Sequence, residues 1–506
     1  MFVRKKKNKS GVISIQIIDK SRGKYRLIKT VGSSVDEKEI ERLFKLGYEQ
    51  IALLIGQQKL DFEAKDKLVF REQLKQIPSS SIRVVGPELI FGKLFDNIGF
   101  NRIKNELFRH LVITRIVHPV SKLKTTDYLL RYKGISVDVS KIYRFLDKLS
   151  NGYQAQAEQI AFEYTKKILG DNIQVIFYDV TTLYFEAEEE DDLRKTGFSK
   201  DGKAQQPQIL LGLLVGLQGY PIGYQIFEGN TFEGHTLIPA LEQIQNKYKL
   251  SKPVVVADAG LLSKSNITQL TNNGYLFILG ARIKVESNTI KQQILKLQLQ
   301  NGKSDVITKA DHTRLVIQYA TARAKKDAHN RKKGLTRLKK QIKTGKLSKA
   351  QINNKGYNKY LKLTGNMTVE LDYEKYKNDK KWDGLKGYIT NSKLSKEQVI
   401  ESYNNLWQIE KAFRISKTDL KVRPIFHFTR RRIEAHISIA FCAYTVLKEL
   451  ERILKLNNLT ISIHRATELA QTIYAIDTLM PDTNKNETII LKMNQQQQAI
   501  YDLINR

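Results

Sequence analysis

The sequence has very little cysteine, since Cys442 is the only one in 506 residues. A single thiol excludes an internal disulfide and a cysteine-rich zinc site, and it suits a reducing cytoplasm. Long apolar runs are also lacking, because none approaches the roughly 18 residues of a membrane-spanning helix. No apolar stretch of the signal-peptide kind follows the basic start MFVRKKKNKS. We therefore expect a soluble, cytoplasmic protein that does not use a membrane.

Acidic residues are too few to balance the basic ones, with 52 Asp and Glu against 85 Lys and Arg and a net charge of +33. The basic residues are spread along the whole chain. Such a surplus indicates a polyanionic partner, most simply nucleic acid, because neutralising phosphates releases condensed counterions. It disfavours a glycosidase built on glutamate. Ribosomal or anionic-membrane partners remain open on charge alone.

Residues 173–185, IQVIFYDVTTLYF, are nearly all apolar or aromatic. A run this rich in β-branched and aromatic residues predicts a strand buried on both faces. Asp179 is the exception in it, because a buried charge is costly unless it is paired or bound to a metal. The structural alternative is an aspartate that caps a turn through Thr181 or Thr182.

The elements predicted between residues 173 and 282 follow the order strand, strand, strand, helix, strand, helix, strand. This order predicts an α/β fold, a ribonuclease-H-like mixed sheet flanked by helices. In such a sheet Asp179, on the first strand, and Asp258, at the end of PVVVADAG, become neighbours. Two adjacent carboxylates either share a proton or hold a divalent cation, and a phosphate-bearing partner favours the cation.

Changes of periodicity divide the rest of the chain. An alternating pattern predicts a β-hairpin at 11–31, followed by a helix at 36–57. The predicted parts are an N-terminal hairpin arm with its helix (1–86), a helical region that is a candidate for DNA binding (87–170), the first part of the sheet domain (171–283), an insertion (284–386), the second part of the sheet domain (387–456) and a C-terminal tail (457–506).

Three basic segments are candidates for DNA contact. The arm carries Lys5, Lys6, Lys7, Lys9, Arg22, Lys24 and Arg26, and either contacts DNA or forms a solvated edge. In the helical region, HPVSKLKTTDYLLRY and VDVSKIYRFLDKLS have the lengths of a helix pair, which is either a DNA-reading helix-turn-helix or a plain basic pair. In the insertion, Lys325–Lys349 has many cations and almost no acids, and we favour contact with a phosphate backbone.

The helical stretch SKEQVIESYNNLWQIEKAFRISKTDL carries Tyr403, Glu410 and Lys417 at intervals of seven, which places them on one helix face. Arg414 lies one turn beyond Glu410. Apolar neighbours at Trp407, Ile409 and Phe413 would pack the helix down, so an inward-facing glutamate is plausible. A long helix then begins near Arg430, Arg431 and Arg432, and its apolar body is expected to pack behind the sheet. Isolated histidines (His235, His427, His436) are more often packed than catalytic, and Gly202 in SKDGK indicates a plain turn.

These segments together resemble the DDE-class transposases of bacterial insertion sequences, in the group with a β-rich insertion before the glutamate. The resemblance is carried by YDVTTLYF, GFSKDGK, FEGNTFEGHTL, VVADAGLLSKSN, SYNNLWQIEKAFRISK and RPIFHF. Its most specific part is the pattern Y-x2-R-x3-E-x6-K. The chain matches this pattern at Tyr403, Glu410 and Lys417, and departs from it at Leu406, where the family has arginine.

The resemblance implies a metal-binding triad of Asp179, Asp258 and Glu410 that holds two Mg²⁺ or Mn²⁺ ions, and it requires the three carboxylates to converge. It implies that Tyr403 and Lys417 position double-stranded DNA, and we add Arg414 and Arg430–Arg432 as further DNA-binding cations. The implied activity is metal-dependent cleavage at transposon ends and strand transfer into target DNA, by a homodimer on paired ends. A metal-dependent nuclease of the same fold and a non-catalytic basic DNA-binding protein are the alternatives.

Overall fold

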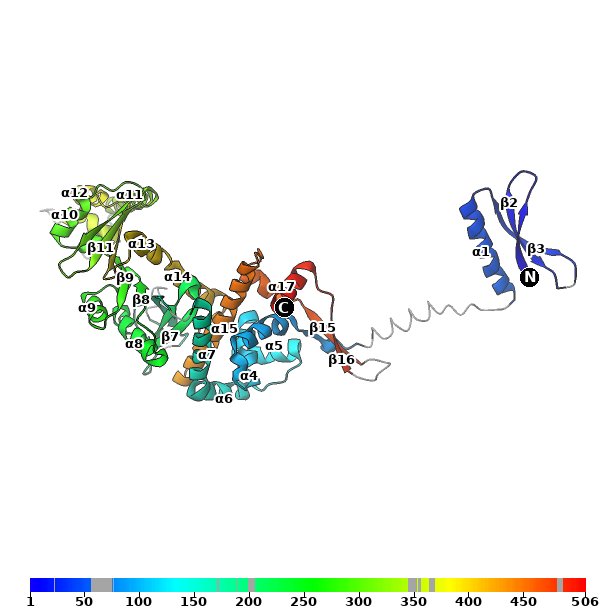
Figure 1. Cartoon of the computed structure of the whole chain (residues 1–506), viewed down its shortest axis with the longest axis horizontal. Helices are drawn as coiled ribbons and strands as arrows, with labels where there is room; N and C mark the ends of the chain where they lie inside the picture. The colour runs from blue at the N-terminus through cyan, green and yellow to red at the C-terminus, as the bar shows by residue number, and fades with distance from the viewer. Residues whose placement is uncertain are drawn as a thin grey trace. The chain divides into compact units, whose positions relative to one another are not determined.

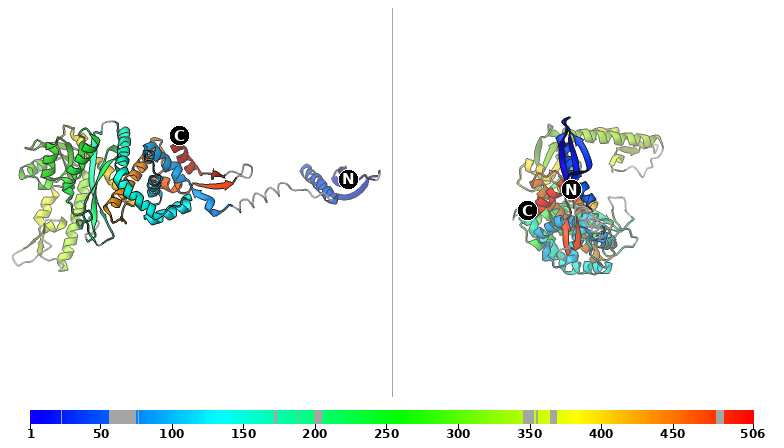
Figure 2. Two further views of the ribbon diagram at one scale, coloured as in Figure 1. Left: turned by 90° about the horizontal axis from the view of Figure 1, so that it is seen from below. Right: turned by 90° about the vertical axis from the view of Figure 1, so that its right-hand side faces the viewer.

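The computed structural model of the chain describes all residues except 22, 56–74, 76, 171–172, 188, 199–204, 345–352, 354–355, 364–368 and 480–485 (Figures 1 and 2). The predicted turn at Gly202 and the end of the basic stretch at 345–349 lie outside the described residues. The chain divides into two compact units, Met1–Ser81 and Ile82–Arg506.

The first unit is a three-stranded antiparallel sheet covered by one helix. It consists of β1 (Phe2–Lys7), β2 (Ile13–Asp19), β3 (Arg26–Ser34) and α1 (Glu37–Leu54). Strands β2 and β3 are the predicted hairpin. The basic start forms strand β1 on its open edge instead of a tail, because Val3 adds to the apolar cluster of Ile15 and Ile17 under α1.

The second unit is built around an eight-stranded mixed sheet. Its strands are β5 (Val175–Tyr184), β6 (Gln208–Val215), β7 (Pro221–Glu228), β8 (Val254–Ala257), β9 (Leu276–Ala281), β10 (Ser304–Thr308), β11 (Arg314–Tyr319) and β14 (Leu385–Thr390). They lie in the order β10-β11-β14-β9-β8-β5-β6-β7. Strands β5, β6 and β7 are antiparallel neighbours, whereas β8 is parallel to both β5 and β9. This topology confirms the predicted ribonuclease-H-like sheet.

Part of the predicted insertion is continuous with this sheet. Strand β14 pairs with β9, β11 pairs with β14 and β10 forms the edge. The rest consists of α10 (Asn288–Lys296), α11 (Thr321–Lys343), η10 (Gly356–Tyr360), the short pair β12 (Leu361–Leu363) and β13 (Val369–Leu371), and α12 (Tyr373–Lys380). Helix α11 projects from the edge of the sheet (Figure 2). Leu338, Tyr360 and Leu361 form a small core beneath it.

Helices cover both faces of the sheet, and the alternation along β5 sends its side chains to both. Ile176 and Tyr178 join a core with α8 (Leu237–Tyr248) and α9 (Lys264–Asn272). Phe177 and Leu183 join a larger core with α13 (Lys396–Asn404), α14 (Trp407–Arg414) and α15 (Arg430–Leu456). Odd-numbered residues of β5 therefore face α14.

The helical region packs around α15, whose central residues are buried almost throughout. Its elements are α3 (Lys93–Ile98), α4 (Glu106–Val117), α5 (Lys122–Lys133), α6 (Val139–Lys148) and α7 (Gln154–Leu169). Helices α4, α6 and α7 contact α15, which itself contacts β7. The C-terminal segment returns to this region as α16 (Ile463–Ala470), β15 (Tyr474–Leu479), β16 (Asn486–Ile490) and α17 (Gln495–Asn505), and β15 pairs with β4 (Ile82–Val84).

Two histidines are buried near the start of α15. His427 and His436 are 6% and 4% exposed, and their ring centroids are 5.4 Å apart. Burial lowers the pKa of His427 to about 3, and the nearby Lys122 and Arg115 add to the effect. Burial likewise holds the pKa of His436 well below its usual value. Both rings are therefore neutral packing residues, as expected from the sequence.

These histidines predict that the protein loses stability in mild acid. Below about pH 6.5 the unfolded chain protonates both rings while the folded chain does not, so the free energy of unfolding falls as the pH falls. The two buried neutral rings make their full contribution to stability above about pH 6.5, and this contribution shrinks as the pH falls toward 3. Between pH 7.5 and 5.5 we expect a loss of about 2.7 kcal/mol for the pair. Urea unfolding at the two pH values measures it, and the His427→Asn variant should show a smaller loss. Equal stability at both values would contradict the buried, neutral pair.

Candidate active site

Asp179 and Asp258 lie on adjacent parallel strands. The last paired residues of β5 and β8 are Tyr178 and Ala257, and each aspartate directly follows one of them. Phe177 and Val256, two positions earlier on the two strands, both belong to the core under α14. By strand alternation, Asp179 and Asp258 therefore point to the face that α14 covers. The two aspartates therefore follow neighbouring strands of the sheet, as the order of elements predicted.

Neither aspartate is fully buried. Asp179 is half-buried and Asp258 is exposed, although the whole run from 173 to 185 was predicted to be buried. The reason is that β8 ends at Ala257, so the sheet offers Asp179 no paired neighbour on that side. The site therefore opens at the carboxyl edge of the parallel strands, where a substrate can reach it.

Asp258 is held by its own turn and by a tyrosine. Its Oδ1 accepts hydrogen bonds from the backbone N–H of Ala259 (2.6 Å) and the hydroxyl of Tyr403 (3.0 Å). Tyr403 is 7% exposed, and burial, aided by the charge of Asp258, raises its pKa. Gly280 on β9 makes room for this tyrosine, since a Cβ there would lie 2.5 Å from the hydroxyl oxygen. Tyr403 thus orients Asp258, a role that the predicted contact with DNA did not include.

Glu410 lies on α14, which packs against β5 and β6. Ile409, Ala412 and Phe413 are buried beneath the helix, while Glu410 is exposed at its rim. The predicted continuous helix is interrupted by a turn at Asn405–Leu406, so Tyr403 lies in the last turn of α13 and Lys417 falls in the π-helical turn η11 (Ile415–Asp419). Leu406, at the position of the family arginine, is buried in the core and 7% exposed.

Lys386 on β14 interacts electrostatically with two of these carboxylates, those of Asp258 and Glu410. Its ammonium lies 4.5 Å from the ring centroid of Tyr403 and 5.1 Å from that of Tyr388. Burial and the charge of Arg323 lower the pKa of Lys386, while the charges of Asp258 and Glu410 oppose that effect. Asp258 and Glu410 therefore act on the same cation.

The predicted convergence of the three acids on one point is not seen. In the described part of the chain, no three Asp, Glu, His or Cys side chains gather closely enough to hold a metal ion. Asp258 is instead engaged by the hydrogen bonds from Ala259 and Tyr403. The donor set itself consists of hard oxygen ligands, which fit Mg²⁺ or Mn²⁺.

Glu233 is a fourth acid near the site that was not singled out from the sequence. It begins the short helical turn η6 (Glu233–His235), which packs against η7 (Ala259–Leu261), the turn that follows Asp258. Its Oε2 lies 4.0 Å from the position of a Cβ on Gly260. Burial raises the pKa of Tyr178, and the charges of Asp179 and Glu233 both add to this effect. The sequence signal that could have pointed to Glu233 is the segment FEGNTFEGHTL, in which it is the second of two glutamates.

The predicted DNA-binding cations lie in different surroundings. Arg414 is exposed, and Lys417 is half-buried. Arg430 pairs with Asp192 (3.0 Å) and Glu434 (3.1 Å), and Arg432 forms two 2.9 Å hydrogen bonds with Asp147. Arg431 is exposed and makes no ion pair with the residues that the structure describes. Arg430 and Arg432 thus have structural partners already, whereas Arg414 and Arg431 face solvent.

Comparison with known protein families identifies the domain that contains this sheet edge. Residues 171–446, which include Asp179, Asp258 and Glu410, match the family described as "Transposase DDE domain". The chain belongs to this family. Membership makes it a DDE transposase and hence a phosphoryl-transfer enzyme.

The chain is also similar to a solved structure. That structure is described as "Cryo-EM structure of piggyBac transposase synaptic complex with hairpin DNA (SNHP)", at 11% sequence identity and a TM-score of 0.38, with 76% of each chain covered. Comparison with curated protein sequences gives no match for this DDE transposase. None of its described helices is both long enough and apolar enough to cross a membrane.

Proposed function

We propose that the chain is the transposase of an insertion sequence, which cuts DNA at the transposon ends and joins the freed ends to target DNA. The observation that carries this proposal is the pair Asp179 and Asp258 at one sheet edge, on the face covered by the helix of Glu410. All three acids lie within the residues matched by the transposase family. The net charge of +33 supports a DNA substrate.

Asp179, Asp258 and Glu410 would hold the divalent cations, with Mg²⁺ or Mn²⁺ as the fitting ions and two as the proposed number. When bound, such ions activate the attacking oxygen and stabilise the leaving oxygen of an in-line displacement. Tyr403 keeps Asp258 oriented through its hydroxyl and remains protonated at neutral pH. Glu410 sits on the rim of α14, free of the core, so its side chain has room to move toward the two aspartates.

DNA contact is proposed for the exposed Arg414 and Arg431 and for the half-buried Lys417. Arg414 lies one helical turn beyond Glu410, and Lys417 and Arg431 follow later in the chain. Arg430 and Arg432 would contribute only if DNA displaced their carboxylate partners. Tyr403 is proposed as a support for Asp258 first and as a DNA-positioning residue second. A homodimer on paired ends is part of the same proposal.

Strand joining separates a transposase from a nuclease of the same fold. The full chain is incubated with Mg²⁺, a plasmid target and a labelled duplex that carries the inverted repeat flanking its coding sequence. We expect the labelled 3′ end to appear covalently joined to the plasmid. Cleavage of the duplex without any joined product would identify a nuclease instead, and DNA binding without cleavage would identify a non-catalytic protein. Absence of flanking inverted repeats would contradict an insertion-sequence origin.

A further inference from the structure

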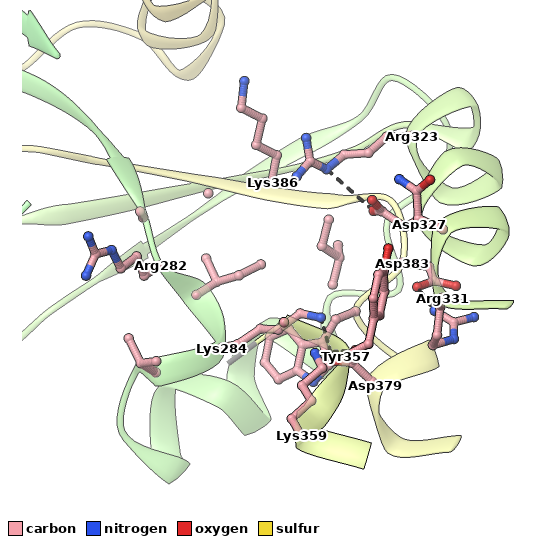
Figure 3. Close-up of a pocket in the computed structure, with 18 of the residues that line it drawn as sticks. Arg282, Lys284, Arg323, Asp327, Arg331, Tyr357, Lys359, Asp379, Asp383 and Lys386 are labelled. Carbon is pink, nitrogen blue, oxygen red and sulfur yellow. Dashed lines mark hydrogen bonds and ion pairs between the residues drawn. The ribbon is translucent and has the colours of Figure 1, made fainter. Parts of the chain in front are cut away.

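A basic cleft lies between the sheet and the helices of the insertion (Figure 3). It has a volume of about 510 Å³. Its walls are the end of β9, the start of β14, the first turns of α11, η10 and the end of α12. Six cations and three aspartates line it, so the cleft carries a surplus of positive charge.

The cations at one end of the cleft are already neutralised. Asp379 accepts hydrogen bonds from Lys284 (2.6 Å) and Lys359 (2.7 Å), which together hold its pKa far below the usual range against the effect of burial. Arg331 pairs with Asp383. These contacts join η8 (Ile283–Val285) and η10 to α12, and α11 to the turn that follows α12. Their role is to build the wall of the cleft.

The cations at the other end lack close partners among the described residues. Lys386 makes no ion pair there and rests on the faces of two tyrosines. Arg323 has one loose contact, in which its Nε lies 3.6 Å from Oδ2 of Asp327. That same oxygen accepts the backbone N–H of Gly384 (3.2 Å), so Asp327 is shared. Arg282 is exposed and has no described ion pair.

Two like charges are thus held close together. Figure 3 shows the guanidinium of Arg323 beside the side chain of Lys386, on the side of the cleft away from Asp379. Their repulsion contributes, after burial, to the lowered pKa of Lys386. An anion placed between the two cations would relieve this repulsion. The charges of Asp258 and Glu410 also affect the pKa of Lys386, so this end of the cleft adjoins the carboxylate site.

We infer that Arg323 and Lys386 together bind a backbone phosphate of the DNA strand, next to the phosphate that reacts at Asp258 and Glu410. The inference rests on the proposed function for the identity of the polyanion. A guanidinium supplies a fork of donors that matches phosphate oxygens, and an ammonium adds a point charge. Arg323 and Lys386 are positioning residues here, and they set the register of the strand in the site.

The test measures how DNA binding by the full chain depends on salt. The probe is a labelled 30-base-pair duplex of random sequence without divalent ions, between 50 and 300 mM KCl. Loss of this one phosphate contact should lower the magnitude of the slope of log K against log salt by about 0.9, and loss of either of the two cations that share it should lower the slope by part of that amount. We expect Arg323→Gln and Lys386→Gln each to show that change, with binding weakened about 10-fold at the lowest salt. Lys386→Arg keeps a cation and should keep the slope.

Lys296→Gln is the matched control. Lys296 is an exposed lysine of α10 in the same insertion that does not line the cleft, so the substitution removes one charge elsewhere and should leave the slope unchanged. An unchanged slope in Arg323→Gln, whose side chain is 47% exposed, would overturn the inference. So would an equal loss in the control. If the slope falls as expected but the wild-type chain neither cuts nor joins DNA, the phosphate site stands and the proposed function fails.

Discussion

Asp258→Asn is expected to lower Mg²⁺-dependent DNA cleavage by about 10³-fold or more, because a neutral amide is a poor ligand for a hard divalent cation. The asparagine carbonyl can still accept the hydrogen bonds from Ala259 and Tyr403, so the turn after β8 should keep its shape. Asp179→Asn and Glu410→Gln should cause losses of the same order. DNA binding without divalent ions should stay within about 3-fold of the wild type, since no cation of the protein is removed.

Asp305→Asn is the matched control for these variants. Asp305 is an exposed aspartate on β10 whose Oδ1 also accepts a neighbouring backbone N–H, that of Val306 (2.8 Å), as Asp258 does with Ala259. Its replacement should leave cleavage unchanged. Rates are measured on the labelled duplex at saturating Mg²⁺. Full cleavage by any one of the three site variants would show that the acids do not act as a unit.

Glu451→Ala should lower the free energy of unfolding by about 3–5 kcal/mol, because it leaves a buried lysine without its carboxylate partner. Glu451 on α15 accepts from Lys411 and Lys448 and pairs with Lys455 at 3.1 Å. The side chain of Lys448 is only 4% exposed and would lose its partner. Burial opposes ionisation of Glu451, yet the lysine hydrogen bonds outweigh it and lower its pKa to about 2.

The same substitution should also slow cleavage at temperatures where the protein stays folded. Lys411 adjoins Glu410 in the chain, and its ion pair with Glu451 ties α14 to α15. Urea unfolding followed by circular dichroism gives the stability, and the duplex assay gives the rate. Glu397→Ala removes an exposed acid from α13 and should change stability by about 0.5 kcal/mol or less. A loss below about 1 kcal/mol for Glu451→Ala would contradict a buried ionic network.

The core of the fold could be predicted because its signals are local. Apolar runs marked β5 and β8, and the order of elements between them was enough to make Asp179 and Asp258 neighbours. Which face they share is visible only once Phe177 and Val256 are placed in the same core. Glu410 was found from its spacing to Tyr403 and Lys417, but that spacing assumes one continuous helix and does not reveal the turn at Asn405–Leu406 between α13 and α14.

Other features could not be predicted because they depend on distant partners. Strands β10 and β11 read as part of a separate insertion, yet they complete the sheet through β14. The C-terminal segment showed no pattern of its own, and its strand β15 is fixed by pairing with β4 near the other end of the unit. Lys386 and Glu233 stand near the site only because separate elements of the sheet domain meet there.

The central claim is that Asp179, Asp258 and Glu410 together hold divalent cations. A Mn²⁺ titration of the full chain in the presence of duplex DNA tests this claim directly. Electron paramagnetic resonance measures the binding as the loss of the free-ion signal. We predict saturable binding by the wild type and by Asp305→Asn, and weakening of about 10-fold or more in Asp179→Asn, Asp258→Asn and Glu410→Gln. Equal Mn²⁺ binding by the wild type and all three site variants would contradict it.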